Sequence, residues 1–344
     1  MTFFPIHIGK FKESIWKERN LFIWAVLLSL WGCMGEAEDQ FDINYQTCSG
    51  ELEDRHDSLP QIRGALVTTR FDSYKALEEV IQIRYGSTYT DRDGQQKASW
   101  VELTHCSGRS EVRAMLGEGV SEQDFSDARD KGLSEKLSLL VLSPFSVRNR
   151  QDLQRVSLLA RRKPDLFGEG DAAFYDLSEA IMCHIPEEEK VRHSELDLLS
   201  EKGYFNTVNH IIAQAFMTTL FSEKVADLVG DAHERKTLPA LIHGNFTEAQ
   251  LNDMANGPVD NYIDMLNNQW GQELGKELKR YFGINRETVW TANLLANYLN
   301  ELQAYFSWAF QIGFSPFRPE DVIVQKFSLK MQEVLPDAYF KGSM

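Results

Sequence analysis

The stretch from Asn209 to Glu234 reads NHIIAQAFMTTLFSEKVADLVGDAHE and decides the fold of the carboxy-terminal part. Its apolar residues recur at helical spacing on both sides of Ser222, a residue type that commonly caps the start of a helix. This pattern predicts a helical hairpin that turns at Ser222. His210 lies 12 residues before Ser222, and His233 lies 11 residues after it. At a rise of about 1.5 Å per residue both lie roughly 17 Å from the turn, so we expect the two histidines to lie level with each other.

A second polar row follows on a longer predicted helix, from Val259 to Phe282. Asp260, Asp264 and Asn268 are spaced i, i+4 and i+8 on it. Residues with this spacing share one face of a helix. If this helix packs on the hairpin, two imidazoles, the Glu234 carboxylate and the Asp/Asn row converge.

These side chains are the types that hydrolytic sites use, because imidazole and carboxylate bind Zn and a carboxylate can act as general base. We expect a divalent metal such as Zn, or an oriented water, with Glu234 as the base and an asparagine donating to an oxyanion. The predicted catalytic residues are Glu234, His210, His233, Asn267 and Asn268, and the predicted metal ligands are His210, His233 and Asp264. The alternative is a buried polar network that fixes helix packing.

The string N-H, G-D-A-H-E and I-D-M-L-N-N-Q-W-G resembles an uncharacterised bacterial helical domain family found in secreted and toxin-like proteins. Its members carry an R-H helix start, D-A-H-E and M-D-L-H-N-N-x-x-G. This chain departs from that pattern at Asn209, where arginine is usual, and at Leu266, where histidine is usual. The resemblance implies that these polar positions form a site, and it supplies no substrate.

The amino terminus resembles a bacterial lipoprotein signal. A basic stretch precedes the apolar run from Leu21 to Trp31, which is too short to span a bilayer and fits a signal-peptide core. Gly32-Cys33 follows, so we expect residues 1–32 to be removed and Cys33 to carry a lipid such as palmitate. A plain signal peptide cut elsewhere and an uncleaved short anchor are the alternatives. Met34 after the cysteine favours the outer membrane, with the protein facing the periplasm.

The charge of the chain argues against nucleic acid. The net charge is −15, and it becomes −17 without residues 1–32. Binding to phosphates needs clustered Lys and Arg, and the one dense cluster is Arg161-Arg162-Lys163. We therefore predict a membrane partner through the lipid anchor, no nucleic acid, and an unknown envelope substrate or protein partner.

Three cysteines remain besides Cys33. Cys48 and Cys106 both lie in Cys-Ser-Gly sequences of the amino-terminal part, and in an oxidising compartment we predict a disulfide between them. Cys183 is predicted to be a buried structural cysteine.

The fold class that these patterns predict is mainly α, with a helical bundle-like carboxy-terminal domain and a small α/β amino-terminal region. The expected parts are a signal peptide (1–32), a tether (33–60), the α/β region (61–145) and the helical domain with the site (146–344). In the α/β region we expect strands at 65–69 and 98–104 with a helix at 73–85 between them. Beyond Glu111 we expect helices alone, at 135–142, 150–162, 176–183, 194–202, the hairpin, the Asp264 helix, 288–312 and 319–333.

No Gly-x-Ser-x-Gly, His-Glu-x-x-His or Cys-x-x-Cys motif occurs, so the sequence excludes the common serine hydrolase, zincin and zinc-ribbon patterns. The sequence predicts an envelope lipoprotein that hydrolyses peptidoglycan or lipid. The alternative is a non-enzymatic binding or assembly lipoprotein in which the polar cluster is structural.

Overall fold

The computed structural model describes residues 64–336, except 87, 91–95, 99, 108–109, 131–132 and 195. All of the described residues belong to one compact unit. The predicted signal peptide at 1–32 and tether at 33–60 lie outside them. None of the helices in the described part is both long enough and apolar enough to cross a membrane.

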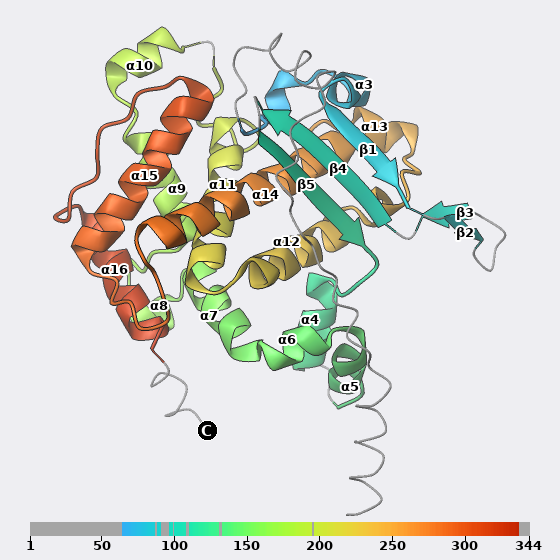
Figure 1. The fold of residues 1–344 in the computed structure, drawn as a ribbon, viewed down its shortest axis with the longest axis horizontal. Helices are drawn as coiled ribbons and strands as arrows, with labels where there is room; N and C mark the ends of the chain where they lie inside the picture. The colour runs from blue at the N-terminus through green and yellow to red at the C-terminus, as the bar shows by residue number, and fades with distance from the viewer. Residues whose placement is uncertain are drawn as a thin grey trace, which may run out of the picture. The chain divides into compact units, whose positions relative to one another are not determined.

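The structure is mainly α-helical with a small α/β region at its amino-terminal side (Figure 1). Its larger sheet is antiparallel in the order β1-β4-β5, with Ile81 opposite His105 and Trp100 opposite Gly117. The strands are β1 (Ile81–Tyr85), β4 (Trp100–Ser107) and β5 (Ser110–Gly117), and a separate pair is formed by β2 (Thr88–Thr90) and β3 (Gln96–Ala98).

The remaining regular secondary structure of the described residues is helical, and the bounds of the helices follow in chain order. They are η1 (Thr68–Arg70), α3 (Tyr74–Glu78), α4 (Glu122–Asp130), α5 (Leu133–Leu142), α6 (Pro144–Arg148), α7 (Arg150–Ala160), α8 (Pro164–Phe167), α9 (Phe174–Cys183), α10 (Glu187–Arg192), α11 (Tyr204–Leu220), α12 (Glu223–Thr237), η2 (Pro239–Ile242), α13 (Glu248–Asn252), α14 (Pro258–Tyr281), α15 (Ala292–Phe310) and α16 (Val322–Val334).

The predicted hairpin is confirmed as α11 and α12. The Ser222 hydroxyl accepts a hydrogen bond from the Val225 N–H at 3.3 Å and so caps α12. The long helix expected at 259–282 is α14, and the core helix expected at 288–312 is α15, which begins later because Thr291 is its cap.

The predictions for the amino-terminal region are wrong in detail. The helix expected at 73–85 is only α3, and β1 follows it, because Ile81 and Ile83 alternate with polar residues as a strand requires. The segment 65–69 forms no strand, since Leu66 bonds to the side chain of Asn267 instead of to a neighbouring strand. Strand β5 was missed, and 194–202 forms turns before α11.

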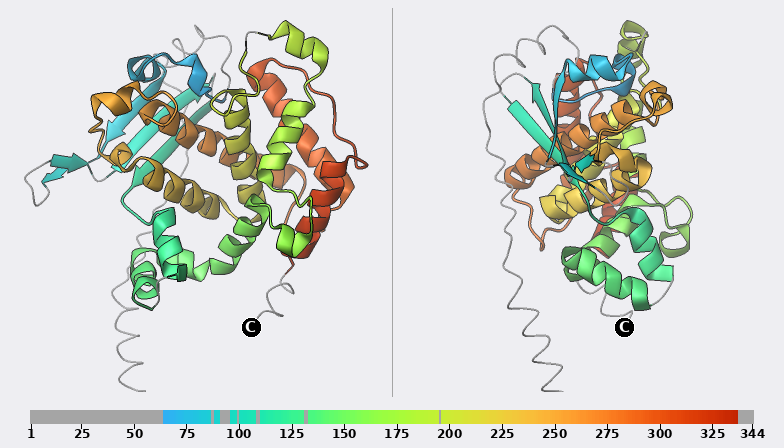
Figure 2. Two further views of the ribbon diagram at one scale, coloured as in Figure 1. Left: turned by 180° about the vertical axis from the view of Figure 1, so that it is seen from behind. Right: turned by 90° about the vertical axis from the view of Figure 1, so that its right-hand side faces the viewer.

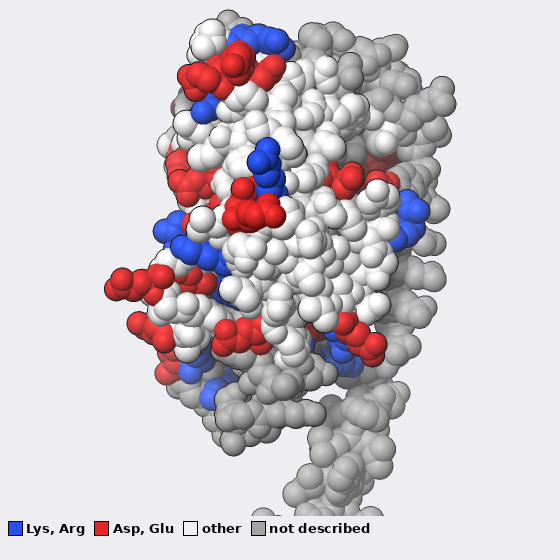
Figure 3. Space-filling model, turned by 90° about the vertical axis from the view of Figure 1, so that its left-hand side faces the viewer, with Lys and Arg blue, Asp and Glu red and all other residues white. Residues whose placement is uncertain are grey.

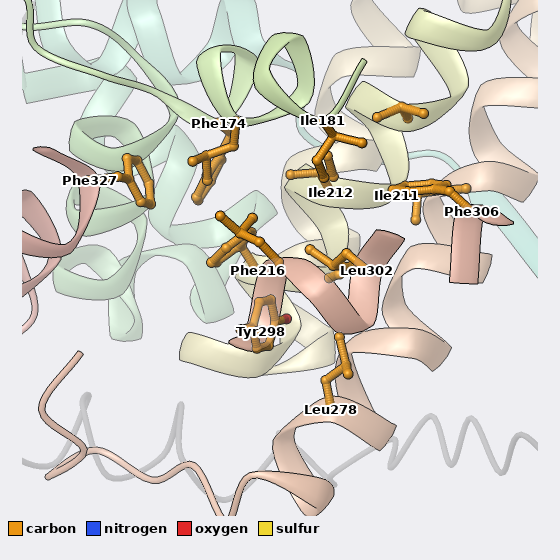
Figure 4. Close-up of a cluster of buried hydrophobic side chains, with 14 of the residues drawn as sticks. Phe174, Ile181, Ile211, Ile212, Phe216, Leu278, Tyr298, Leu302, Phe306 and Phe327 are labelled. Carbon is orange, nitrogen blue, oxygen red and sulfur yellow. The ribbon is translucent and has the colours of Figure 1, made fainter. Parts of the chain in front are cut away.

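Helix α14 contributes to two apolar cores, through Leu278 to one and through its first half to the other. One is formed by α7, α9, α11, α15 and α16, with Phe216 at its centre (Figure 4). The other lies between the sheet, η2 and the first half of α14, where Tyr262, Leu266 and Trp270 meet Leu103 and Leu116. Figure 2 shows the sheet from two further sides, with α14 running across it. Helix α14 therefore joins the two parts that the sequence divides at residue 145, and they pack as one unit.

Candidate functional site

Helices α11 and α14 are joined by a series of polar pairs that we call the polar ladder. Each pair joins a residue in or just before α11 to the α14 residue that lies 58 positions later in the chain, so the two helices run parallel. The pairs are Lys202–Asp260, Asn206–Asp264, His210–Asn268 and Gln214–Gln272, with donor–acceptor distances of 2.7, 2.9, 2.9 and 3.1 Å. The spacing of four residues keeps every pair on the facing sides of the helices.

Two glycines let the helices approach closely beside the ladder. A Cβ atom added at Gly271 would lie 2.7 Å from the Ile211 carbonyl oxygen, and one at Gly275 would lie 2.6 Å from that of Ala215. No side chain fits at such distances, so the backbones of the two helices touch here. The close approach brings the short side chains of the ladder within hydrogen-bonding distance of each other.

Helix α12 packs against the ladder through Gly230 and Glu234. A Cβ atom at Gly230 would lie 2.9 Å from Gln214 Nε2 and 3.1 Å from Asn268 Nδ2. One turn further along α12, the Glu234 side chain is 1% exposed, and its Oε1 atom has no hydrogen-bond partner. Burial, followed by the nearby carboxylates of Asp264 and Asp260, raises the pKa of Glu234 well above its usual value.

His210 and Asp264 form the centre of the ladder. The imidazole Nε2 lies 3.3 Å from Asp264 Oδ2, and Nδ1 lies 2.9 Å from Asn268 Oδ1. Both ring nitrogens therefore face oxygen atoms, and the ring is held in one orientation. Burial raises the pKa of Asp264 to about 6, and His210 opposes that shift.

Two further carboxylates lie on α12. Burial and the charge of Asp231 raise the pKa of Asp227 to about 7. Burial also raises the pKa of Asp231 to about 6, although its ion pair with Arg235 at 2.9 Å opposes the shift. Together with Glu234, these residues give α12 three carboxyl groups that hold their protons to a higher pH than usual.

His233 does not join the ladder, and the prediction that it shares a ligand with His210 is wrong. Its side chain is 53% exposed, and its Nδ1 atom lies 3.3 Å from Glu122 Oε1 on α4. Adjacent residues on a helix are about 100° apart, so His233 and Glu234 cannot both face α11 and α14. Among the described residues no group of three or more His, Cys, Asp or Glu side chains is arranged to hold a metal ion. The predicted ligand set of His210, His233 and Asp264 is therefore not brought together.

Asn267 lies beside the ladder and binds a different segment. Its amide accepts from the Leu66 N–H and donates to the Leu66 carbonyl, both at 2.8 Å, and the side chain is fully buried. The Thr207 hydroxyl donates to the same carbonyl. Asn267 thus ties the segment before η1 to α14, and its amide is hydrogen-bonded to Leu66 instead of being available to a substrate oxyanion, as the prediction required. Asn268 is the asparagine that faces His210.

The sequence-based prediction missed several members of the ladder. Asn206 and Gln214 lie four residues before and after His210, and Lys202 lies eight before it. This i, i+4 repeat is the signal that would have found them. Asp260 also accepts from the Thr68 hydroxyl at 3.1 Å, a partner that no local pattern could indicate.

The cysteines are only partly described. Cys106 is buried and disulfide-bonded, while its predicted partner Cys48 lies outside the described residues, so that pairing stays a prediction. Cys33, the predicted lipid acceptor, also lies outside them. Cys183 is a free, exposed cysteine at the end of α9, and the prediction that it is buried is wrong.

Comparisons with protein-family models, curated proteins and solved structures found no match for this chain.

Proposed function

We propose that the protein is a bacterial envelope lipoprotein that hydrolyses an envelope substrate, peptidoglycan or lipid, by acid–base catalysis at the ladder. One observation supports this most strongly: the carboxyl group of Glu234 is buried among other carboxyl groups, and one of its oxygens has no partner. A buried polar atom without a partner costs about 1–3 kcal/mol. Such a cost is more readily explained by chemistry than by stability.

In this proposal Glu234 is the group that moves a proton. A carboxylate whose pKa is raised is a stronger base than an ordinary one, and a base of this kind becomes an acid once it has taken up a proton. Glu234 accepts a proton from the attacking water and later returns it to the leaving group. Asp264 and His210 fix the arrangement beside it, and in this proposal the amide of Asn268, which lies beside Gly230 of α12, donates to the developing negative charge.

Two members of the ladder are partly exposed to solvent. The side chains of Lys202 and His210 are 36% and 18% exposed, whereas those of Asp260 and Asp264 are 5% and 11% exposed. A substrate would therefore meet Lys202 and His210 first. The carboxyl groups lie behind them, where they are shielded from bulk water.

The decisive variant is Glu234→Gln, which keeps the shape of the side chain and removes its acidity. We expect hydrolysis to fall by about 10² or more while the protein stays folded. Glu273→Gln is the matched control, because Glu273 is a similarly buried glutamate on α14 that pairs with Lys276. Release of products from cell walls and from phospholipids should be screened, with the melting temperature of each variant as the check on folding. Equal activity in both variants and the wild type would exclude Glu234 as the catalytic group.

The anchor is tested separately through Cys33→Ala. The lipid, and not the short apolar run, is expected to hold the protein to the membrane, so this variant should lose lipidation and leave the membrane fraction. Labelling with a fatty-acid probe identifies the modification. Tight membrane association of the variant, with an unlabelled wild type, would contradict the lipoprotein assignment.

A non-enzymatic binding or assembly lipoprotein is the second candidate. It is favoured by the observation that the two residues of each ladder pair hydrogen-bond to each other across α11 and α14, as a network that fixes helix packing would do. In that case Glu234→Gln should change the melting temperature, and no hydrolysis should be found with any substrate in the screen.

A further inference from the structure

Helix α5 exposes a group of large aliphatic side chains at its carboxy-terminal end. The exposed residues are Leu137 at 54%, Leu140 at 46%, Val141 at 79% and Leu142 at 60%. The first three have the i, i+3, i+4 spacing that places them on one face. Figure 1 shows α5 at the edge of the molecule beside α4 and α6, away from the sheet and the apolar cores.

This group has no equivalent elsewhere in the described part. No other element there exposes more than two large apolar side chains, and isolated ones are normal on soluble proteins. On the side of the molecule that carries α15, Figure 3 shows an uncharged area bordered by groups of acidic and basic side chains. Helix α15 has a single charged residue, Glu301, but Trp308 is the only large apolar residue that it exposes to a comparable degree. Exposed aliphatic surface is therefore concentrated on α5.

The chain that precedes the described residues bears on what covers this face. In the proposed function Cys33 carries the lipid, and 30 residues, 34–63, separate it from Gly64. An extended chain of that length spans at most about 100 Å, so the folded part stays close to the bilayer and can turn any face toward it. A tether of this kind raises the effective concentration of the surface, so that a weak contact becomes populated.

The charges near α5 indicate which lipids suit it. Helix α4 packs on α5 and carries four acidic residues, Glu122, Asp124, Asp127 and Asp130, against one basic residue, Arg129, whereas Lys136 on α5 is exposed beside the apolar face. A lysine next to an apolar face can extend its ammonium group to lipid phosphates. The acidic helix would be repelled by a strongly anionic surface, so a mainly zwitterionic one is favoured.

We propose that the exposed aliphatic group at the end of α5, with Leu137, Leu140 and Val141 on one face and Leu142 beside them, inserts into the phospholipid surface to which the protein is anchored. This contact would set the orientation of the folded part on the membrane. The inference rests on the lipid anchor of the proposed function and adds a second, non-covalent contact to it.

The experiment uses the full, lipidated chain in vesicles of phosphatidylethanolamine with a minor share of phosphatidylglycerol. An environment-sensitive fluorophore is attached at Val141→Cys, in a Cys183→Ser background that removes the exposed free thiol. Val289→Cys and Val322→Cys are the matched controls, because these valines are 64% and 68% exposed on other parts of the surface. We expect the label at position 141 to shift to shorter wavelength and to be quenched several-fold more by spin-labelled lipid than the labels at the two controls.

Each other outcome is informative. A label at position 141 that behaves like the controls, on protein that still sediments with the vesicles, would overturn the α5 contact and leave the anchor intact. Loss of all three labelled proteins from the vesicles would instead point to failure of the anchor. A shift at position 141 that appears without lipid and grows with protein concentration would show that a second copy covers the face, and this too would overturn the proposal.

Discussion

The two faces of α11 make different kinds of contact: one packs in an apolar core, and the other forms hydrogen bonds. On one face Phe216 packs on Phe174, Tyr298 and Phe327 in the apolar core (Figure 4). On the other, His210 and its neighbours bond to particular atoms of α14. Apolar contact has no direction, so one side chain can replace another of similar size at modest cost. A hydrogen bond needs a matched partner at one place, and a buried polar group without it is costly.

The apolar face should show the largest loss on truncation. Phe216→Ala removes a fully buried ring that packs on other aromatic rings, and we expect it to lower the free energy of unfolding by about 3–5 kcal/mol. Tyr281→Ala removes an aromatic side chain that is 68% exposed and should cost less than about 0.5 kcal/mol. Urea unfolding of the two variants gives both values. A loss below about 1 kcal/mol for Phe216→Ala would mean that this core is loosely packed.

This comparison also explains how much could be predicted from the sequence. The hairpin, α14 and α15 were expected because apolar spacing within one helix reports its buried face. The shared face of Asp260, Asp264 and Asn268 was expected for the same reason. The pairing of Asn206 with Asp264 was missed, because it depends on α11 and α14 running parallel at an offset of 58 residues. No local pattern reports that arrangement.

His233 and Asn267 show the same limit at the site. Their residue types suit a catalytic site, but type does not fix direction. The rotation of α12 that points Glu234 inward turns His233 to Glu122. The side chain of Asn267 is hydrogen-bonded to the backbone of Leu66. Strand β5 was not predicted, because the helical periodicity of the segments that follow it hides its alternation.

The polar contacts of α14 should show the next largest effect. Asn267→Ala removes both hydrogen bonds to Leu66 and leaves its buried N–H without the Asn267 partner. We expect a loss of about 2–4 kcal/mol, since each such group costs about 1–3 kcal/mol. Asn252→Ala, at an exposed position on α13, is the control and should change little. An equal effect in both variants would show that the tie to Leu66 contributes nothing.

The pH dependence of stability should come from the buried carboxyl groups of α12 and α14. The pKa of Asp264 is raised from 3.8 to about 6 and that of Asp227 from 3.8 to about 7, so between about pH 4 and pH 7 the folded state holds more protons than the unfolded chain. Stability must then fall as the pH rises through this range. Each pKa unit corresponds to about 1.4 kcal/mol.

Urea unfolding at about pH 5 and about pH 8 measures this loss, and Asp227→Asn should make it smaller. Asp321→Asn is the matched control, because Asp321 caps the turn before α16 away from the ladder. Stability that rises from the lower to the higher pH would show that these carboxyl groups do not hold their protons in the folded state.

The smallest effect is expected for His233→Ala. The sequence predicts His233 as a catalytic residue, whereas the structure brings only His210 into the ladder, and this variant tests the difference. The imidazole is half exposed, and its partner Glu122 is also held by Lys236 at 3.0 Å. Exposed ion pairs contribute about 0–1 kcal/mol, so stability should fall by less than about 1 kcal/mol and activity should not change. His210→Ala, in contrast, removes the contacts to Asp264 and Asn268. It should reduce activity, as Glu234→Gln is expected to do. If His233→Ala abolished activity without lowering the melting temperature, while His210→Ala did not, the catalytic centre would lie between α12 and α4 instead of at the ladder.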